Sequence, residues 1–403
     1  MLSILSIVAF ALVALSSAYL LVAIYGTLRF RGRLHAQNRS ACQPLTVLKP
    51  LCGDEVELAE NLRSFCRQNH PDFQVIFGVR DHNDPAAHIA RGIIDEFPNR
   101  DISLVVDNRV IGSNLKVSNL VNMAGAAKHD ILVVSDSDMR VEPDYLSKVA
   151  AAFEDPGVGA ATCLYSGSAR GGLASKLGAM FINDWFFPSA LIPALFGKLS
   201  FCFGATMAVR RDALSKMGGF ESLADVLADD YMLGNRVIGQ GRRIALVPYV
   251  VKNIVTEPDL RTLFRHEMRW ARTIRNVQPG GYGMSLITEA FPLSMLAAGL
   301  LWAGGSPIWM IVGPVILSLA LRTCLHVAVN AAVGNPDDFT PWLIPLRDAF
   351  SIAVRVSAYF GTRVHWRGQV LNVHADSRLR EMPSVVEAAP ADGRLQEAAG
   401  ILK

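Results

Sequence analysis

Residues 133–141 read Val-Val-Ser-Asp-Ser-Asp-Met-Arg-Val, an apolar run that ends in two aspartates one residue apart, Asp136 and Asp138. A strand that stops there would present both carboxylates at the carboxyl edge of a sheet, where open α/β folds bind ligands. Two carboxylates at this spacing suit a hard divalent cation, Mg²⁺ or Mn²⁺, that also holds a diphosphate. The alternative is an Asp-Ser-Asp turn in which the aspartates only cap the backbone.

Short strands and helical segments alternate from Pro44 to about Gly283. Strands are predicted at 45–48, 74–79, 102–106 and 131–134, with helices at 56–68, 86–97 and 115–128. This alternation predicts an α/β fold with a parallel-rich central sheet that is covered on both faces. Lys49, Asp81 and Asp136 follow strand ends, so we expect one ligand crevice at that edge. The absence of Gly-x-Gly-x-x-Gly after the first strand and of a Gly-Lys-Ser/Thr loop disfavours dinucleotide oxidoreductases and P-loop enzymes.

The chain has 403 residues, 51% hydrophobic and 19% charged, which fits one soluble domain with several membrane segments. Residues 1–28 carry no charge and are long enough to span a bilayer. A cleaved signal peptide would need a basic start and a shorter apolar core. The positive-inside rule places the basic residues that follow, and the domain after them, in the cytoplasm; they are Arg29, Arg31, Arg33 and Arg39.

Further apolar segments lie toward the C-terminus. Residues 290–321 carry no charge and are broken by Gly-Gly-Ser-Pro at 304–307, which predicts a membrane hairpin whose second helix reaches about Val333. Residues 342–360 are interfacial or re-entrant, because their charges would be costly at mid-bilayer. The predicted division is therefore a membrane anchor at 1–28, a cytoplasmic domain at 29–283, a membrane region at 284–362 and a loosely ordered tail at 363–403.

A broad apolar face covers residues 173–199, interrupted by Asn183, Asp184 and two prolines. It predicts either a segment lying in the membrane interface or a buried core helix, and both remain open here. The net charge of +3 and the lack of a basic patch interleaved with aromatic residues argue against a nucleic-acid partner. The six cysteines lack Cys-x-x-Cys spacing, which predicts reduced thiols without a zinc site. Nothing in these patterns predicts an oligomeric state.

Five motifs together resemble the ceramide glucosyltransferase family. They are Val79–Ala86 with the first aspartate, Asn114–Leu120 around Lys116, Asp136–Val141, the acidic pair in Ala228–Tyr231, and His266–Trp270 as the closing Gln/Arg-x-x-Arg-Trp signature. Their order agrees with the family, and the match covers roughly residues 45–371. Two positions depart from the pattern: His266 replaces the usual Gln or Arg, and Asp138 stands where animal members often have Gly.

The resemblance implies a GT-A-like fold with an N-terminal transmembrane helix and C-terminal membrane helices. It implies an inverting hexosyltransferase that uses a UDP-sugar and Mg²⁺ or Mn²⁺ and acts on a membrane lipid alcohol. Similar bacterial sequences include an enzyme of hopanoid biosynthesis thought to add N-acetylglucosamine to a hopanoid polyol. The expected sugar is therefore glucose or N-acetylglucosamine, the acceptor ceramide or a hopanoid polyol, and the location the cytoplasmic face of a bacterial inner membrane.

Each motif residue has a role in such a transfer, which needs charge neutralisation, a proton acceptor and exclusion of water. Asp136 and Asp138 are the predicted metal ligands. The family pattern puts the catalytic carboxylate at Asp230, with Asp229 orienting it. The other expected contacts are Asp81 with uracil or ribose, Lys116 with the nucleotide or diphosphate, Arg269 with the diphosphate, Trp270 with the sugar or acceptor, and His266 with the acceptor or a neighbouring group.

Other interpretations exist for the roles of single residues and for the function of the whole chain. Lys116 could be a solvated helix lysine, and Arg269 could belong to a basic stripe that faces lipid headgroups. A processive polysaccharide synthase shares the aspartates and the Arg-Trp motif, but it usually needs more spanning helices. A lipid-binding membrane scaffold would not need the intact set of motif residues.

Overall fold

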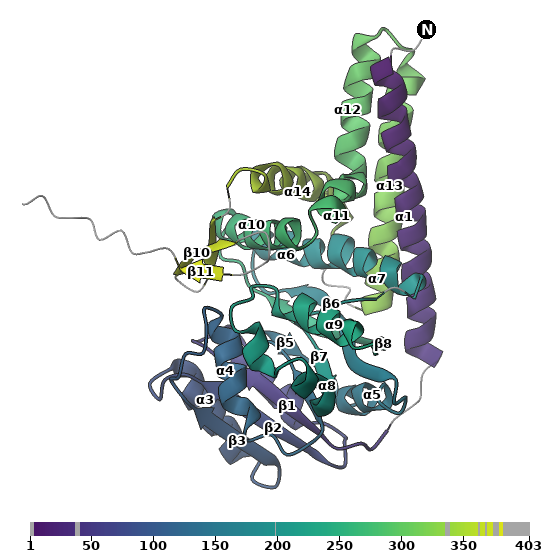
Figure 1. The fold of residues 1–403 in the computed structure, drawn as a ribbon. Coiled ribbons are helices and arrows are strands. Elements are labelled where there is room, and N and C mark those ends of the chain that lie inside the picture. The colour runs from purple at the N-terminus through teal and green to yellow at the C-terminus, as the bar shows by residue number, and fades with distance from the viewer. Residues whose placement is uncertain are drawn as a thin grey trace, which may run out of the picture.

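The computed structural model describes residues 4–36, 41–197, 199–334, 339–361, 363–366, 369–373 and 379–381. A bundle of apolar helices stands on a layer of helices that lie across its foot, and an α/β domain lies beneath them (Figure 1). Most of the predicted tail at 363–403 is outside the described residues. Its described part is a three-stranded antiparallel sheet of β9 (Arg363–Trp366), β10 (Gln369–Val373) and β11 (Leu379–Glu381).

The main sheet of the described residues has eight strands in the order β3-β2-β1-β4-β7-β6-β8-β5. Four neighbours run parallel: β3 (Asp101–Val106), β2 (Phe73–Val79), β1 (Leu45–Pro50) and β4 (Ile131–Val134). The others are β7 (Met207–Arg210), antiparallel to β4 and β6, then β6 (Val158–Ala169) parallel to β8 (Arg243–Val255), and β5 (Met139–Arg140) antiparallel to β8. The predicted parallel-rich sheet is confirmed, whereas the antiparallel strands were not predicted.

Side-chain alternation explains why both faces of this sheet are covered. Val47 and Val133 point into the core formed with α2 (Leu58–Cys66), α3 (Pro85–Glu96) and α5 (Tyr145–Ala151). Leu48 and Val134 point into the opposite core, formed with α4 (Leu115–Ala124), α8 (Arg211–Lys216) and α9 (Asp229–Gly239). Since both faces are closed, the carboxyl edge of the strands is left for ligands.

Within the described part of the chain, two helices are long and apolar enough to cross a membrane, within α1 (Ile4–Ala36) and as α13 (Ile308–Val333). A third span is counted if α12 (Ala290–Ala303) is joined to the preceding α11 (Pro279–Met284) and η3 (Ser285–Thr288), across a bend of 68°. The turn between α12 and α13 uses Gly305 at φ 66°, a left-handed conformation that favours glycine. Helix α1 extends beyond the predicted anchor, and its last turns carry Arg29, Arg31 and Arg33 on the side of the α/β domain (Figure 1).

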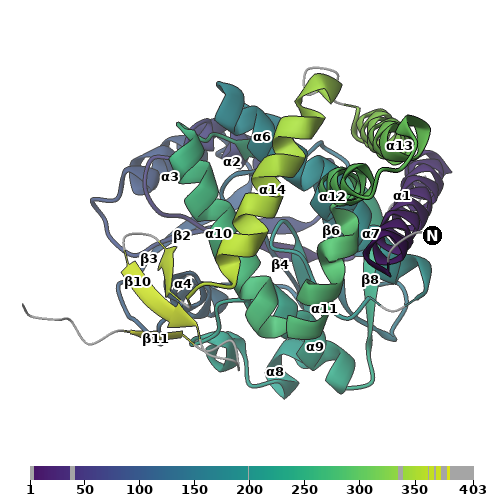
Figure 2. The same cartoon turned by 90° about the horizontal axis from the view of Figure 1, so that it is seen from above.

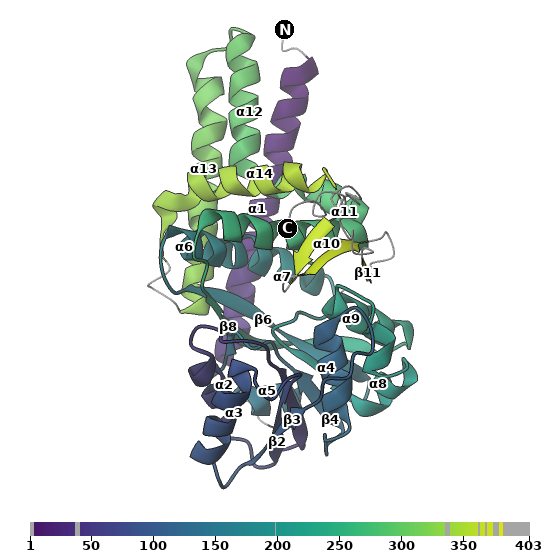
Figure 3. The same ribbon diagram turned by 90° about the vertical axis from the view of Figure 1, so that its left-hand side faces the viewer.

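Helix α14 (Ile344–Ala358) lies across the foot of the bundle, over α10 (Leu260–Val277) (Figures 2 and 3). Its charged side chains are buried in three ion pairs: Arg347–Glu267 at 2.6 Å, Asp348–Arg322 at 2.7 Å and Arg355–Glu289 at 3.0 Å. The side chains it exposes are apolar and include Leu346 and Val356, with Trp342 and Phe360 at either end. Since the charges of α14 point inward and its apolar face points outward, the structure favours an interfacial position over a re-entrant one.

The apolar segment 173–199 forms α6 (Leu173–Phe181), a π-helical turn η1 (Ile182–Phe186) and α7 (Phe187–Leu195). Phe187 and Leu191 are buried in a core shared with α1. Phe181 and Phe186 instead face a large cavity. The segment therefore contacts the membrane helices on one side and a cavity on the other. Neither prediction, a segment in the membrane interface or a buried core helix, included the cavity.

Candidate active site

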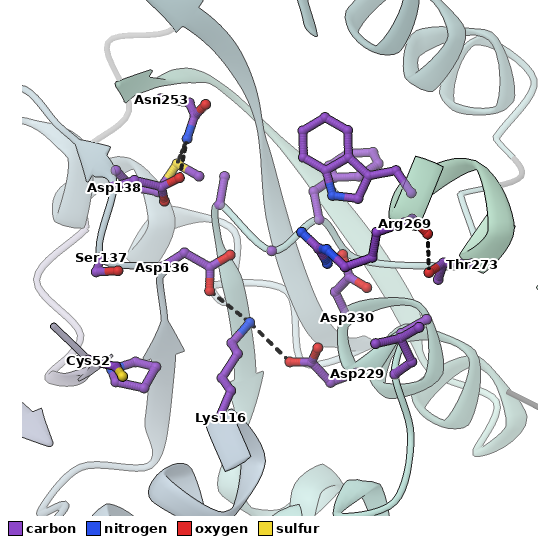
Figure 4. A pocket seen from close by; sticks show the side chains of 18 of the residues that line it. Cys52, Lys116, Asp136, Ser137, Asp138, Asp229, Asp230, Asn253, Arg269 and Thr273 are labelled. Carbon is purple, nitrogen blue, oxygen red and sulfur yellow. Dashed lines mark hydrogen bonds and ion pairs between the residues drawn. The ribbon is translucent and has the colours of Figure 1, made fainter. Parts of the chain in front are cut away.

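One cavity of about 1340 Å³ opens at the carboxyl edge of the sheet. Its polar end is formed by the ends of β1, β2 and β4 together with the start of α9. Its other end is aromatic and is formed by α6, η1 and α10. Every residue predicted for the site lines it: Asp81, Lys116, Asp136, Asp138, Asp229, Asp230, His266, Arg269 and Trp270. Figure 4 shows how several of them converge.

The turn after β4 holds Asp136 and Asp138 at the centre of the polar end. Asn253 of β8 donates to the Asp138 carboxylate at 2.7 Å. Lys49, buried at the end of β1, donates to the Asp136 carbonyl, and burial lowers the pKa of this lysine to about 8. Burial, and then the neighbouring Asp136, raise the pKa of Asp138 to about 7. The two carboxylates are thus crowded together at a partly exposed position on the cavity wall.

Such a pair fits a divalent cation, because a cation would relieve the cost of keeping both carboxylates charged. The described residues contain no group of three or more His, Cys, Asp and Glu side chains that could hold a metal. Asp136 and Asp138 would therefore hold the ion together with oxygens of the diphosphate. When bound, it would supply Lewis-acid stabilisation of the leaving diphosphate.

Lys116 of α4 bridges two acidic elements. Its ammonium lies 2.7 Å from Asp136 and 3.1 Å from Asp229 (Figure 4). Burial lowers the pKa of Lys116, but these carboxylates outweigh burial and hold the pKa above its ordinary value. The lysine therefore stays charged, and the alternative of a solvated helix lysine does not apply. It holds the turn after β4 and the start of α9 together.

Asp230 lies in the first turn of α9, a rigid mount at a helix N-terminus. Burial, and then Asp229, raise the pKa of Asp230 to about 6. A carboxylate with a raised pKa is a stronger proton acceptor than an exposed one. Gly204 lies between this group and the turn after β4: a Cβ placed on it would be 2.8 Å from Asp136 Oδ2 and 3.7 Å from Asp230 Oδ2.

We expect Gly204→Ala to lower kcat/KM for sugar transfer about 10- to 100-fold, because the added methyl displaces the Asp136 carboxylate. The backbone of Gly204 is not in the left-handed region, so the fold should survive. The matched control is Gly125→Ala, at an exposed helical position with open space around it. Steady-state kinetics and thermal unfolding of both variants check this. Equal activity of the Gly204→Ala and Gly125→Ala variants would show that a methyl group at position 204 does not displace the Asp136 carboxylate.

Helix α10 brings the closing motif into the aromatic end of the cavity. Arg269 extends from this helix into the cavity (Figure 4). Trp270 stacks on Phe181, with ring centroids 5.4 Å apart. His266 donates a hydrogen bond from its ring to the Glu257 carboxylate at 2.7 Å and lies against Trp270, which suits the predicted orienting role. Glu267, between them in the motif, points away and anchors the helix through its ion pair with Arg347.

Asp81 lies at the outer rim of the polar end, just after β2. Its carboxylate accepts from the Asn83 backbone at 2.9 Å and is exposed to solvent. Asp84, the residue directly after Asn83, caps α3 and also accepts from the Gly53 backbone at 2.8 Å. The exposed Asp81 carboxylate therefore remains accessible for further hydrogen bonds at this rim of the cavity.

The sequence motifs did not reveal several residues that support the turn after β4. Asn61 of α2 donates to the Ser137 carbonyl at 3.3 Å and accepts from Arg140 at 2.9 Å. Glu57 pairs with Arg140 at 2.7 Å and adopts a left-handed conformation, φ 59°. Asn253 was also missed. Its only sequence signal is that, with Lys252, it interrupts the otherwise apolar stretch Val250–Val255, and that signal names no partner.

The family model of Glycosyl transferase family 21 matches residues 8–379. The chain belongs to this family. It is therefore an enzyme, a hexosyltransferase, and the predicted resemblance to ceramide glucosyltransferases is confirmed.

Relatives of the family 21 enzyme agree with this assignment. This chain is similar to ceramide glucosyltransferase 1 of Caenorhabditis elegans. The two are 21% identical over 343 residues, which cover 83% of this chain and 73% of that protein. It is 30% identical to the ceramide glucosyltransferase of Komagataella phaffii over 137 residues, 32% of this chain and 27% of that one.

The fold has a counterpart among solved structures. A mannosyltransferase from Pyrobaculum calidifontis, in complex with GDP-Man and Mn²⁺, superposes with a TM-score of 0.52 at 20% sequence identity. The match covers 89% of this chain and 99% of that one. It confirms the predicted GT-A-like α/β fold, which in this chain is accompanied by the candidate membrane spans in α1 and α13.

Proposed function

We propose that this family 21 enzyme transfers one hexose from a UDP-sugar to the hydroxyl of a membrane lipid, with inversion at the anomeric carbon. The names of its curated relatives support glucose as the sugar and ceramide as the acceptor, ahead of N-acetylglucosamine and a hopanoid polyol. The single observation that carries the proposal is the cavity. Its polar end has the charged residues that a nucleotide diphosphate needs, and its aromatic end lies beside the membrane helices, where a lipid would enter.

The reaction is a direct displacement. The acceptor oxygen forms a bond to the anomeric carbon while the bond from that carbon to the diphosphate oxygen breaks. The electron pair leaves with UDP, and the hydroxyl proton passes to the Asp230 carboxylate. Lys116 and Arg269 supply fixed positive charge, while Asp136 and Asp138 would hold Mg²⁺ or Mn²⁺. No covalent sugar–enzyme intermediate is needed.

The aromatic end suits an acceptor whose tail stays in the bilayer. Trp185 and Phe186 of η1 line the cavity, and the next helix, α7, packs on α1. Only the hydroxyl end of the lipid then has to reach Asp230. The cluster of arginines at the end of α1 nearest the α/β domain supports a cytoplasmic catalytic domain.

Mass spectrometry of lipids from cells with and without this gene tests the proposal. We expect a lipid carrying one hexose to disappear when the gene is deleted and to return with the wild-type gene but not with Asp230→Asn. Loss of a polysaccharide instead would favour the processive synthase. An unchanged lipid and polysaccharide profile would contradict a transfer function.

We expect activity to rise with pH through about 6, because Asp230 accepts a proton only as the carboxylate and burial raises its pKa to about 6. Below that pH, kcat/KM should fall roughly tenfold per pH unit. Initial rates between pH 5 and 8 at saturating metal check this, with donor binding measured over the same range. A rate that is flat from pH 5 to 7 would show that Asp230 is not the base.

We expect Phe186→Ala to impair transfer to lipid more than hydrolysis of the UDP-sugar. Phe186 lines the aromatic end and stacks on Tyr165, so its loss should disturb the acceptor and leave the nucleotide end intact. The control is Phe196→Ala, which removes an exposed aromatic side chain of the same apolar segment, outside the cavity. A parallel fall of both activities together with loss of folded protein would identify Phe186 as ordinary core.

A further inference from the structure

Tyr165 of β6 lines the cavity between its polar and aromatic ends. Its ring lies on Phe186, with centroids 4.4 Å apart and planes inclined by 32°. The same sheet face carries Asn253, because Gly167, two residues further along β6, pairs with Asn253 of β8. Asn253 is the residue that holds Asp138. Tyr165 therefore lies beside the predicted metal-binding turn, and its ring packs against Phe186.

The surroundings of the Tyr165 hydroxyl are charged. Burial, and then the carboxylates of Asp230, Asp138 and Asp136, raise its pKa, while Arg269 lowers it. Four charged groups of the active site therefore act on one hydroxyl. The net upward shift of the pKa means that this hydroxyl remains protonated at physiological pH, so it has a proton to donate in a hydrogen bond and does not act as a base.

These four groups mark the position of the bond that breaks. The proposed function assigns Asp136, Asp138 and Arg269 to the diphosphate side and Asp230 to the acceptor side of the anomeric carbon. Because Tyr165 lines the same cavity as both sets of residues, beside Phe186 and on the sheet face of Asn253, we place its hydroxyl beside the bond between the sugar and the diphosphate. Since negative charge develops there on the leaving oxygen, a neutral donor at this place stabilises the transition state more than the bound substrate.

We propose that the Tyr165 hydroxyl donates a hydrogen bond to the leaving diphosphate oxygen of the UDP-sugar. The inference rests on the proposed function and adds a catalytic residue to it. The tyrosine forms no new covalent bond and keeps its proton. Its hydrogen bond shortens as the sugar–oxygen bond breaks and the electron pair passes to UDP.

The test is Tyr165→Phe in the full-length enzyme, which keeps the ring and its contact with Phe186 and removes only the hydroxyl. The matched control is Tyr145→Phe, which removes a buried hydroxyl bonded to Thr206 outside the cavity. We measure kcat and KM for lipid transfer, the rate of UDP-sugar hydrolysis, and UDP binding by calorimetry. Wild-type enzyme that transfers no sugar to lipid would overturn the proposed function itself, independently of the variant.

With active wild-type enzyme, we expect Tyr165→Phe to lower kcat for transfer and for hydrolysis in parallel, about 10- to 100-fold, because both reactions break the same bond. The KM for the UDP-sugar and the affinity for UDP should change less than threefold, and Tyr145→Phe should keep its kcat. An unchanged kcat for Tyr165→Phe would overturn the assignment. So would a loss confined to lipid transfer with a raised lipid KM, which would place the hydroxyl on the acceptor.

Discussion

Replacing Asp230 by asparagine is expected to reduce sugar transfer by about 10²- to 10⁴-fold while leaving UDP-sugar binding nearly intact. The amide keeps the shape of the side chain and can still accept from the Tyr231 backbone, which donates to Asp230 at 2.8 Å. It cannot take the acceptor proton. Radiometric transfer assays and calorimetric titration with UDP measure the two effects separately.

The control for this substitution is Asp144→Asn, at the N-terminus of α5 and outside the cavity. Asparagine caps helices about as well as aspartate, so this variant should fold and work normally. A loss smaller than tenfold in Asp230→Asn would show that another group accepts the proton. Asp229 would then be the next candidate, although its ion pair with Lys116 makes it a weaker acceptor.

The second large effect is expected from removing the metal or its ligand. Activity should require Mg²⁺ or Mn²⁺, and Asp138→Ala should lower kcat/KM at least about 100-fold because the leaving diphosphate loses Lewis-acid stabilisation. UDP affinity should also become insensitive to added metal. Transfer assays in excess EDTA, followed by addition of Mg²⁺ or Mn²⁺, measure the first point, and calorimetry with and without metal measures the second.

An exposed aspartate at the opposite end of β4 provides the matched control. Asp130→Ala removes a carboxylate that is remote from the cavity, and its activity should stay close to wild type. Full activity in EDTA would contradict the metal role of Asp136 and Asp138. It would instead assign the neutralisation of the diphosphate to Lys116 and Arg269.

The parallel half of the fold could be predicted because each of its strands is a short apolar run that ends at a polar residue. The same signal placed Asp81, Asp136 and Asp138 at one edge. The antiparallel strand β7 could not be predicted, because Met207–Arg210 has four residues and its place depends on pairing with both β4 and β6. Such pairing is set by long-range packing and leaves little trace in local sequence.

The site was predictable where a motif carries its own chemistry, as in Asp136-Ser137-Asp138 and Asp229-Asp230. It was not predictable where a residue acts through a distant partner. Asn253 supports Asp138 across 115 positions of sequence. Tyr165 sits in an unremarkable strand, and only the folded chain brings it to the charged groups. The charges of α14 predicted that this segment does not cross the middle of the bilayer. Their ion-pair partners, Glu267 on α10, Arg322 on α13 and Glu289 just before α12, were not foreseen.

The most direct test of the central claim uses the purified enzyme in detergent with an α-linked UDP-hexose, Mg²⁺ and a membrane lipid alcohol such as ceramide. The product is isolated, its mass determined and its anomeric linkage assigned by NMR. The account predicts a lipid that carries a single β-linked hexose, formed by wild type and absent with Asp230→Asn. An α-linked product, a polymer of the sugar, or release of free sugar without any glycolipid would contradict it.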